Sequence, residues 1–165
     1  MSLTIIAAVG KRLELGKRGG LCFDLPGDLK FFKKITMHKP LLMGYRTWQS
    51  LPRKLPGRTH YVLSPKPVKL PKEIILVQDL KKLTKEWRER NEEMFVIGGG
   101  MVFRQMIELV DRMYLTEVEA EDTEADTFFP NFNQQDWTRK VVGQGQDGNY
   151  YYKHVLYLRK ELKDE

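Results

Sequence analysis

The chain has 165 residues, of which 41% are hydrophobic and one is a cysteine. This composition fits one globular domain and excludes a disordered chain, an internal disulfide and a zinc site built on several cysteines. The net charge of +6 is uneven, because residues 1–72 hold 15 basic and 3 acidic residues, whereas residues 73–165 hold 13 and 19. No apolar run reaches the ~20 residues of a membrane span, and the first residues lack the charges of a signal peptide. We therefore expect a soluble, cytoplasmic protein whose first part attracts anions.

Strands and helices are expected to alternate along the chain. Apolar runs and period-two patterns predict strands at residues 3–9, 40–43, 61–63, 74–77, 94–97, 113–119, 137–142 and 150–159. Helix-start signals and amphipathic spacing predict helices at residues 25–36, 45–50, 79–90 and from 101 onward, and a glycine-rich basic loop at 10–24. This order predicts an α/β fold in a single domain over residues 1–165. Its mostly parallel, twisted sheet has about eight strands, ends in a C-terminal antiparallel hairpin and is flanked by about four helices.

Two junctions between a strand and a helix carry glycines that suit phosphate binding. Gly98–Gly100 precede one predicted helix, and Gly44 precedes another that begins with residues 45–47. Free amides at a helix start bind anions, and glycine lets a phosphate approach the backbone closely. Arg46 lies in a first helical turn, where the helix dipole disfavours a cation unless an anion is bound nearby. Each junction alone is more simply a tight turn, but two of them on one rim suit a dinucleotide.

One carboxylate stands out in the basic segment. Among residues 1–72 only Glu14, Asp24 and Asp28 are acidic, and Asp28 lies in the first turn of a predicted helix. It either complements the helix dipole or is a buried acid facing a ligand. In the second case it suits a planar, amidine-like heterocycle held by two parallel hydrogen bonds.

These features together resemble the dihydrofolate reductases of bacterial type, nearly from end to end. The stretch Leu21–Leu29 is similar to the family's Leu-Pro-Trp-x-Leu-Pro-x-Asp-Leu signature. Further stretches that match in register are Ile6–Ala8, Phe32-Lys33, Met43-Gly44, Thr47-Trp48, Leu55–Arg58, Ile97–Gly100, Tyr114–Thr116 and Asp126–Pro130. Each motif is weak by itself, and the resemblance rests on their order and spacing.

The resemblance implies NADPH-dependent reduction of 7,8-dihydrofolate to tetrahydrofolate, with a hydride going to C6 of the pterin and a proton to N5. It implies NADPH as the cofactor, with dihydrofolate and antifolate inhibitors as small-molecule partners. It further implies a monomer that serves one-carbon metabolism and the synthesis of thymidylate, purines and glycine. A metal site, a nucleic-acid partner and a membrane are not expected.

The resemblance also assigns roles to residues. Asp28 would hold the pterin and favour N5 protonation, together with Leu21 and Phe23 as the catalytic group, and Arg58 would pair with the glutamate α-carboxylate. The implied substrate-binding residues are Ile6, Ala8, Asp28, Leu29, Phe32, Leu51, Leu55, Arg58, Ile97 and Thr116. The implied cofactor-binding residues are Ala8, Leu15, Gly16, Gly44, Tyr45, Arg46, Thr47, Leu63, Ser64, Ile97, Gly98, Gly99, Gly100, Met101, Val102 and Phe103. A cis peptide between Gly98 and Gly99 and a loop at residues 10–24 that closes over the nicotinamide are implied as well.

Three positions depart from the family pattern. Cys22-Phe23 stands where Pro-Trp is usual, which removes an indole N–H that anchors an active-site water. Tyr45 stands where an arginine commonly contacts the 2′-phosphate of NADPH, so Arg46 is the candidate for that contact. Phe103 replaces a tyrosine that many members carry.

Three other functions compete with this interpretation. A riboflavin-pathway reductase shares the fold, but Asp28 and Arg58 argue against it. The basic segment suggests a nucleic-acid-binding module, although no known binding motif is present. The change to Phe23 allows a homologue that binds folate without turnover.

The remaining candidates are expected to be structural. The three histidines, His38, His60 and His154, are expected on the surface or in loops, and Cys22 is expected to be a packed thiol. The acidic run at residues 117–126 is expected to form a solvated face.

Overall fold

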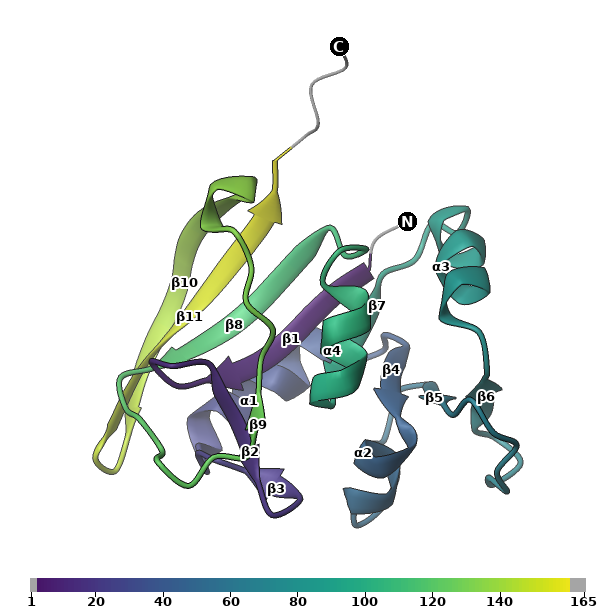
Figure 1. Ribbon diagram of the computed structural model, residues 1–165, viewed down its shortest axis with the longest axis horizontal. Coiled ribbons are helices and arrows are strands. Elements are labelled where there is room, and N and C mark those ends of the chain that lie inside the picture. The colour runs from purple at the N-terminus through teal and green to yellow at the C-terminus, as the bar shows by residue number, and fades with distance from the viewer. Residues whose placement is uncertain (1–2, 161–165) are drawn as a thin grey trace.

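Eight strands form one sheet in the computed structural model, which describes residues 3–160 (Figure 1). The strands follow the order β10-β11-β8-β1-β7-β4-β5-β6. Neighbours from β8 to β6 pair in parallel, whereas β11 pairs antiparallel with both β8 and β10. The bounds are β1 Leu3–Val9, β4 Leu41–Gly44, β5 His60–Leu63, β6 Ile75–Val77, β7 Met94–Gly98, β8 Arg112–Val118, β10 Trp137–Asp147 and β11 Tyr150–Arg159. The predicted α/β class with its antiparallel C-terminal hairpin is confirmed.

Four α-helices flank this sheet, as predicted. They are α1 Pro26–Thr36, α2 Tyr45–Ser50, α3 Leu80–Arg88 and α4 Gly100–Met106. Two start signals act as expected: Pro26 occupies the first turn of α1, and the Asp79 carboxylate accepts a hydrogen bond from the Lys82 amide at the start of α3. In Figure 1, α4 lies in front of the sheet and α1 behind it.

Alternating side chains along the strands divide the core between the two faces of the sheet. Ile5 packs with residues of α3 and α4, and the next residue, Ile6, packs with residues of α1. We call these the α4 face and the α1 face. At the end of β8, Thr116 reaches Asp28 of α1, whereas Glu117 and Leu115 line a pocket on the α4 face.

Residues 10–24 are more ordered than predicted. They contain β2 Glu14–Lys17 and β3 Gly20–Leu21, which join β9 Thr127–Phe128 in a small antiparallel sheet. The prediction of a plain loop is therefore wrong, because strand pairing with the distant β9 has no local sequence signal. A 3₁₀ turn, Gln134–Asp136, leads into β10, which continues five residues past its predicted end through an irregularity between Val141 and Gly143.

Candidate active site

The site begins with a chain of three polar side chains on the α1 face. Asp28 of α1 accepts a hydrogen bond at Oδ1 from the Thr116 hydroxyl of β8, with 2.5 Å between the oxygens. His154 of β11 lies on the other side of that hydroxyl, with its Nδ1 2.8 Å from Thr116 Oγ1 and 3.7 Å from Asp28 Oδ1. One helix and two strands, far apart in sequence, therefore supply one hydrogen-bonded group.

Burial changes the proton affinity of both titratable members of this group. Loss of solvent raises the pKa of Asp28 above its usual value, and the Thr116 hydrogen bond and nearby His154 oppose that rise. Loss of solvent also lowers the pKa of His154, although the charges of Asp28 and Asp147 act in the opposite direction. The site thus holds an acid whose charged form is costly, which is typical of a carboxylate that works on a ligand.

The placement of two histidines corrects the sequence prediction. His154 is 7% exposed and His60 is 1% exposed, whereas His38 is exposed as predicted. His154 meets its partner Thr116 only through the fold, whereas the partners of His60 lie two and five residues before it in the sequence. In the case of His60, Nε2 accepts from the Leu55 amide at 2.9 Å and Nδ1 lies 3.2 Å from the Arg58 carbonyl oxygen. His60 therefore holds both ends of the 55–58 turn.

The start of α1 is fixed by the turn between β10 and β11. Asp147 accepts hydrogen bonds at Oδ2 from the Gly27 amide at 2.7 Å and from the Tyr152 hydroxyl at 3.2 Å. A Cβ on Gly27 would collide with that hydroxyl oxygen, so a larger residue there would displace the Tyr152 side chain. These contacts set the position of Asp28, the next residue.

Apolar side chains from several elements form one wall on the α1 face. Ile6 of β1 packs in the same cluster as Phe32, Leu51, Leu55 and Ile97, all of which resemblance assigns to the substrate. Ala8 of β1 is half-buried nearby in sequence. Two other assigned leucines project outward instead: Leu29 is 55% exposed and Leu21 is 73% exposed.

A cation lies at the opposite end of α1 from Asp28. Arg58 donates from Nε to Thr36 Oγ1 at 3.2 Å and from Nη1 to the Pro56 carbonyl at 2.8 Å. Its Nη2 is buried and has no hydrogen-bond partner among the described residues. Burial lowers the pKa of Arg58, but a guanidinium stays charged. A buried, unpaired N–H of a cation is costly, so an anion that accepts a hydrogen bond from Nη2 would bind favourably there.

Glycines at the ends of β4 and β7 form the second part of the site. The Gly98–Gly99 peptide is cis, as the resemblance implied. A Cβ on Gly99 would lie 3.3 Å from Thr47 Oγ1, and one on Gly44 would lie 3.1 Å from a methyl group of Val102. The backbones of these two junctions therefore approach one another, and both lie at the carboxyl edge of the sheet, where ligands of α/β proteins bind.

The other residues assigned to the cofactor fall into two groups. Tyr45, Arg46, Leu63 and Met101 lie at or near the surface, and Met101 is 71% exposed. The buried group consists of Leu15, Gly16, Ser64, Val102, Gly100 and Phe103. The hydroxyl hydrogen of Ser64 is already donated to the Lys66 carbonyl at 2.7 Å, so this hydroxyl can only accept from a ligand.

Residues 10–24 are tied to residues 119–128 by hydrogen bonds that the sequence did not predict. The carboxylate of Glu14, 1% exposed, accepts from the Arg12 amide at 2.7 Å and from the Asp122 amide at 2.6 Å. Asp126 accepts from the Arg18 amide at 2.9 Å. Asp122 also pairs with Lys17 at 2.7 Å, so the acidic run is not simply a solvated face.

Cys22 and Phe23 pack behind this hairpin. Both are buried with Leu25, Val118 and Tyr152, and the Phe23 ring meets the Tyr150 ring edge-on at 5.4 Å. Burial raises the pKa of the Cys22 thiol to about 11. The prediction of a packed, unreactive thiol is supported, since a nucleophile needs the opposite shift.

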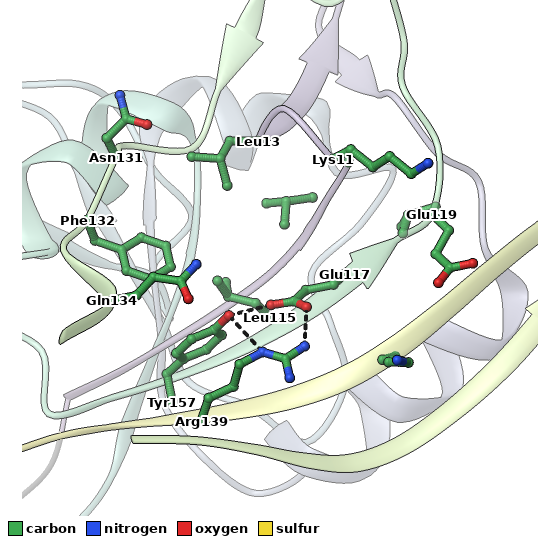
Figure 2. Close-up of a pocket in the computed structure, with 14 residues that line it drawn as sticks. Lys11, Leu13, Leu115, Glu117, Glu119, Asn131, Phe132, Gln134, Arg139 and Tyr157 are labelled. Carbon is green, nitrogen blue, oxygen red and sulfur yellow. Dashed lines mark hydrogen bonds and ion pairs between the residues drawn. The ribbon is translucent and has the colours of Figure 1, made fainter. Parts of the chain in front are cut away.

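A separate pocket of about 420 Å³ lies on the α4 face (Figure 2). Figure 2 shows the Glu117 carboxylate beside the Arg139 guanidinium and the Tyr157 hydroxyl, which both bond to it. The Arg139–Glu117 pair measures 2.5 Å, and burial beside Glu117 raises the pKa of Tyr157 to about 12. These three polar groups are satisfied by one another.

The fold and the site define an α/β protein that presents a titratable carboxylate and a glycine rim at the carboxyl edge of its sheet. The known proteins that this chain resembles point to one family. The family model described as "Dihydrofolate reductase" matches residues 2–159. The dihydrofolate reductase of Bacillus subtilis is 32% identical over 161 residues, which cover 96% of this chain and 95% of that protein. That of Haemophilus influenzae is 34% identical over 137 residues, covering 83% and 84%.

A solved structure agrees with these relatives. Dihydrofolate reductase from Enterococcus faecalis, complexed with NADP(H) and RAB-propyl, is similar with a TM-score of 0.87. The two are 29% identical, and the match covers 97% of each chain. The chain belongs to the dihydrofolate reductase family.

Proposed function

We propose that the protein catalyses the NADPH-dependent reduction of 7,8-dihydrofolate to tetrahydrofolate. Family membership supports the reaction. The placement of an acid and a cation at opposite ends of α1 supports dihydrofolate as the substrate. Asp28 lies in the first turn of α1, and Arg58 bonds to Thr36, the last residue of the helix and eight residues after Asp28. A helix rises ~1.5 Å per residue, so the acid and the cation lie about 12 Å apart along the helix. This spacing suits a ligand with a hydrogen-bond-donating heterocycle at one end and a carboxylate at the other.

The residues of the α1 face take the following roles in this proposal. Asp28 Oδ2 accepts no hydrogen bond from the described residues and is available to the pterin 2-amino group and N3. Ile6 lies in the middle of β1 and Ile97 near the end of β7, and their carbonyls are proposed to face the pterin and nicotinamide. The apolar wall holds the aminobenzoyl ring, and Arg58 Nη2 binds the glutamate carboxylate.

NADPH supplies the hydride when it is bound. The glycine rim fits such a nucleotide, because Gly44, Gly98 and Gly99 leave backbone space that a Cβ would fill. Thr47 and Arg46 begin α2 beside this rim and are proposed to hold phosphate oxygens. The hairpin at residues 10–24 is proposed to cover the nicotinamide and keep water away from the reacting atoms.

The reaction also consumes a proton, which must reach N5. The raised pKa of Asp28 keeps an exchangeable proton in the site at higher pH than an exposed aspartate would. Phe23 has no hydrogen-bond donor, so a water on this route is not held by that side chain.

We further propose that the protein acts as a cytoplasmic, single-domain monomer. Within residues 3–160, no helix has the length and apolar character needed to cross a membrane.

The deciding assay mixes the protein with NADPH and dihydrofolate and follows nicotinamide absorbance. Oxidation of NADPH is expected only when dihydrofolate is present. Binding of dihydrofolate, measured by fluorescence, without any NADPH oxidation would overturn the catalytic proposal and leave a folate-binding protein.

The substrate end is tested with Arg58→Met. Loss of the guanidinium is expected to raise KM for dihydrofolate by roughly 10- to 100-fold, since hydrogen bonds to charged groups contribute about 1.5–3 kcal/mol. KM for NADPH is expected to change less than ~2-fold. Equal increases in both constants would contradict the placement of the glutamate beside Arg58.

The cofactor end is tested with Arg46→Ala. If Arg46 holds the 2′-phosphate, the preference for NADPH over NADH falls in this variant, because NADH lacks that phosphate. An unchanged ratio of kcat/KM values would exclude Arg46 from this role. Lys140→Ala serves as the control, because this exposed cation lies on β10, at the other edge of the sheet from β4 and β5.

A further inference from the structure

A single hydroxyl, that of Thr116, links His154 to Asp28, the acid that the reaction is proposed to use. The Thr116 hydroxyl carries one hydrogen and stands 2.5 Å from Asp28 Oδ1 and 2.8 Å from His154 Nδ1. When Asp28 is ionised it can only accept, so Thr116 must donate to it. Thr116 Oγ1 then has only lone pairs left, and His154 must donate from Nδ1–H.

The fold holds the imidazole where it can make that donation. Its ring stacks on Phe31 of α1 with 3.8 Å between centroids and 6° between planes. The Tyr152 ring of the same strand also packs against the imidazole, with 5.2 Å between the ring centroids. His154 is 7% exposed, so neither rotation of the ring nor competition from bulk water is easy.

The charged groups around the pair come from three elements. Asp28 belongs to α1, and Asp147 closes β10 and acts on both Asp28 and His154. Tyr152 of β11 donates a hydrogen bond to Asp147 and cannot become positively charged. Among the described residues that act on Asp28 here, His154 is the group that can turn positive.

We propose that His154 is a positioning residue for the reduction, which orients the Thr116 hydroxyl toward Asp28 Oδ1 and leaves Oδ2 to the pterin. The inference rests on the proposed function of Asp28. In its neutral form the imidazole directs the hydrogen bonds toward the carboxylate, and the polarised hydroxyl stabilises the ionised acid. In its protonated form the imidazole adds attraction across 3.7 Å. Both effects lower the proton affinity of the site.

The test is the pH dependence of kcat/KM for dihydrofolate in His154→Phe. Phenylalanine keeps a ring to stack on Phe31 but has no N–H. The basic limb of the profile is expected to move upward by about one pH unit, because the ionised acid loses its stabilisation. KM for NADPH is expected to stay the same. A profile that superimposes on that of the wild type would overturn the proposal.

Two variants separate positioning from packing. His154→Asn places an amide N–H near the position of Nδ1 but removes the ring stack, and it is expected to restore much of the wild-type profile. Tyr157→Phe removes another donor from β11 on the opposite face, where it bonds to Glu117, and is expected to leave the profile unchanged. A shift in Tyr157→Phe equal to that in His154→Phe would also overturn the proposal.

Nitrogen-15 spectra of the wild-type histidines test the same inference without a variant at His154. His154 is expected as the neutral Nδ1–H tautomer near pH 8, and its pKa is expected to fall in Asp28→Asn, which removes the negative charge. The Nε2–H tautomer in the wild type would contradict the proposed direction of hydrogen bonding. A wild-type enzyme without turnover would instead sink the proposed function, and the tautomer would remain measurable.

Discussion

Thr116 and Glu117 are neighbours on β8, yet they belong to two carboxylate networks that differ in charge. On the α4 face, Glu117 pairs with the permanently charged Arg139 and accepts from Tyr157. On the α1 face, the partners of Asp28 among residues 3–160 are a hydroxyl and an imidazole with a lowered pKa. Arg139 is positively charged at every physiological pH, whereas a hydroxyl is uncharged and the charge of an imidazole depends on pH.

Glu117 is therefore an acid that stabilises the structure, whereas Asp28 is an acid that is available to a ligand. Glu117 is compensated within the protein, so a ligand gains nothing by approaching it. Asp28 is buried with less compensation, which is costly in the free protein and favourable when a donating ligand arrives. The same contrast applies to the cations, because Arg139 is paired and Arg58 has an open Nη2.

The largest expected difference between the two acids is in turnover. Asp28→Asn is expected to lower kcat/KM by roughly 10²- to 10³-fold, because acid–base assistance contributes on that order. Glu117→Gln, the matched change on the other face, is expected to lower it less than ~3-fold. Steady-state NADPH oxidation measures both. Similar losses in the two variants would break the distinction between the faces.

Stability is expected to rank the same two variants in the opposite order. Glu117→Gln loses its charge pair with half-exposed Arg139 and weakens the Tyr157 bond, which costs about 1–2 kcal/mol of unfolding free energy. Asp28→Asn is expected to cost nothing at pH 7 or to stabilise slightly. The raised pKa of Asp28 means that the folded state binds this proton more tightly than the unfolded state, so ionisation above that pKa destabilises the fold. Urea titrations at pH 7 check the order, and a larger loss in Asp28→Asn would contradict it.

A smaller effect concerns His60, which supports the turn that carries Arg58. Burial lowers the pKa of His60, so the unfolded state binds a proton first as the pH falls below ~6.5. Its contribution to stability is therefore complete above that pH and is lost below it, by up to about 1 kcal/mol at pH 5.5. His60→Gln keeps polar atoms for the turn but cannot titrate.

The measurement is the difference in unfolding free energy between wild type and His60→Gln at pH 7.5 and 5.5. Asp28 and His154 titrate in both proteins, so their contributions cancel. The wild type is expected to lose more stability than the variant over this range. Equal losses would contradict the prediction, because protonation of His60 would then not weaken the fold around its contacts with Leu55 and Arg58.

Local signals in the sequence predicted most of the fold. Pro26 and Asp79 mark the starts of helices, and the apolar run at residues 3–9 becomes the central β1 with the predicted bounds. What could not be predicted depends on distant pairing. The hairpin at residues 14–21 is completed by β9, more than a hundred residues away, and buried Glu14 is understandable only from the Asp122 amide that it accepts.

The candidate site divides in the same way. Asp28 and the glycine rim follow from residue type and order, because they lie where predictable helices begin, whereas Arg58 is assigned only by the resemblance to the family. His154 could not be found, since a histidine within an apolar-polar strand is ordinary in sequence and gains meaning only when β11 brings it beside Thr116. The registers of non-local strands therefore hold the missing information.

The smallest effect on the enzyme is expected at Cys22, a buried titratable group that packs in one cluster with Tyr152. With its pKa raised to about 11, little thiolate exists at pH 8, so alkylation of the folded protein is expected to be on the order of 100-fold slower than that of an unperturbed thiol. Denaturation in urea is expected to restore the fast rate. Cys22→Ala is expected to change kcat/KM less than ~2-fold, because burial alone does not make a group functional. A large loss of turnover in this variant, with an unchanged unfolding midpoint, would show that the Cys22-Phe23 pair takes part in the reaction and that the α1-face network extends beyond Asp28, Thr116 and His154.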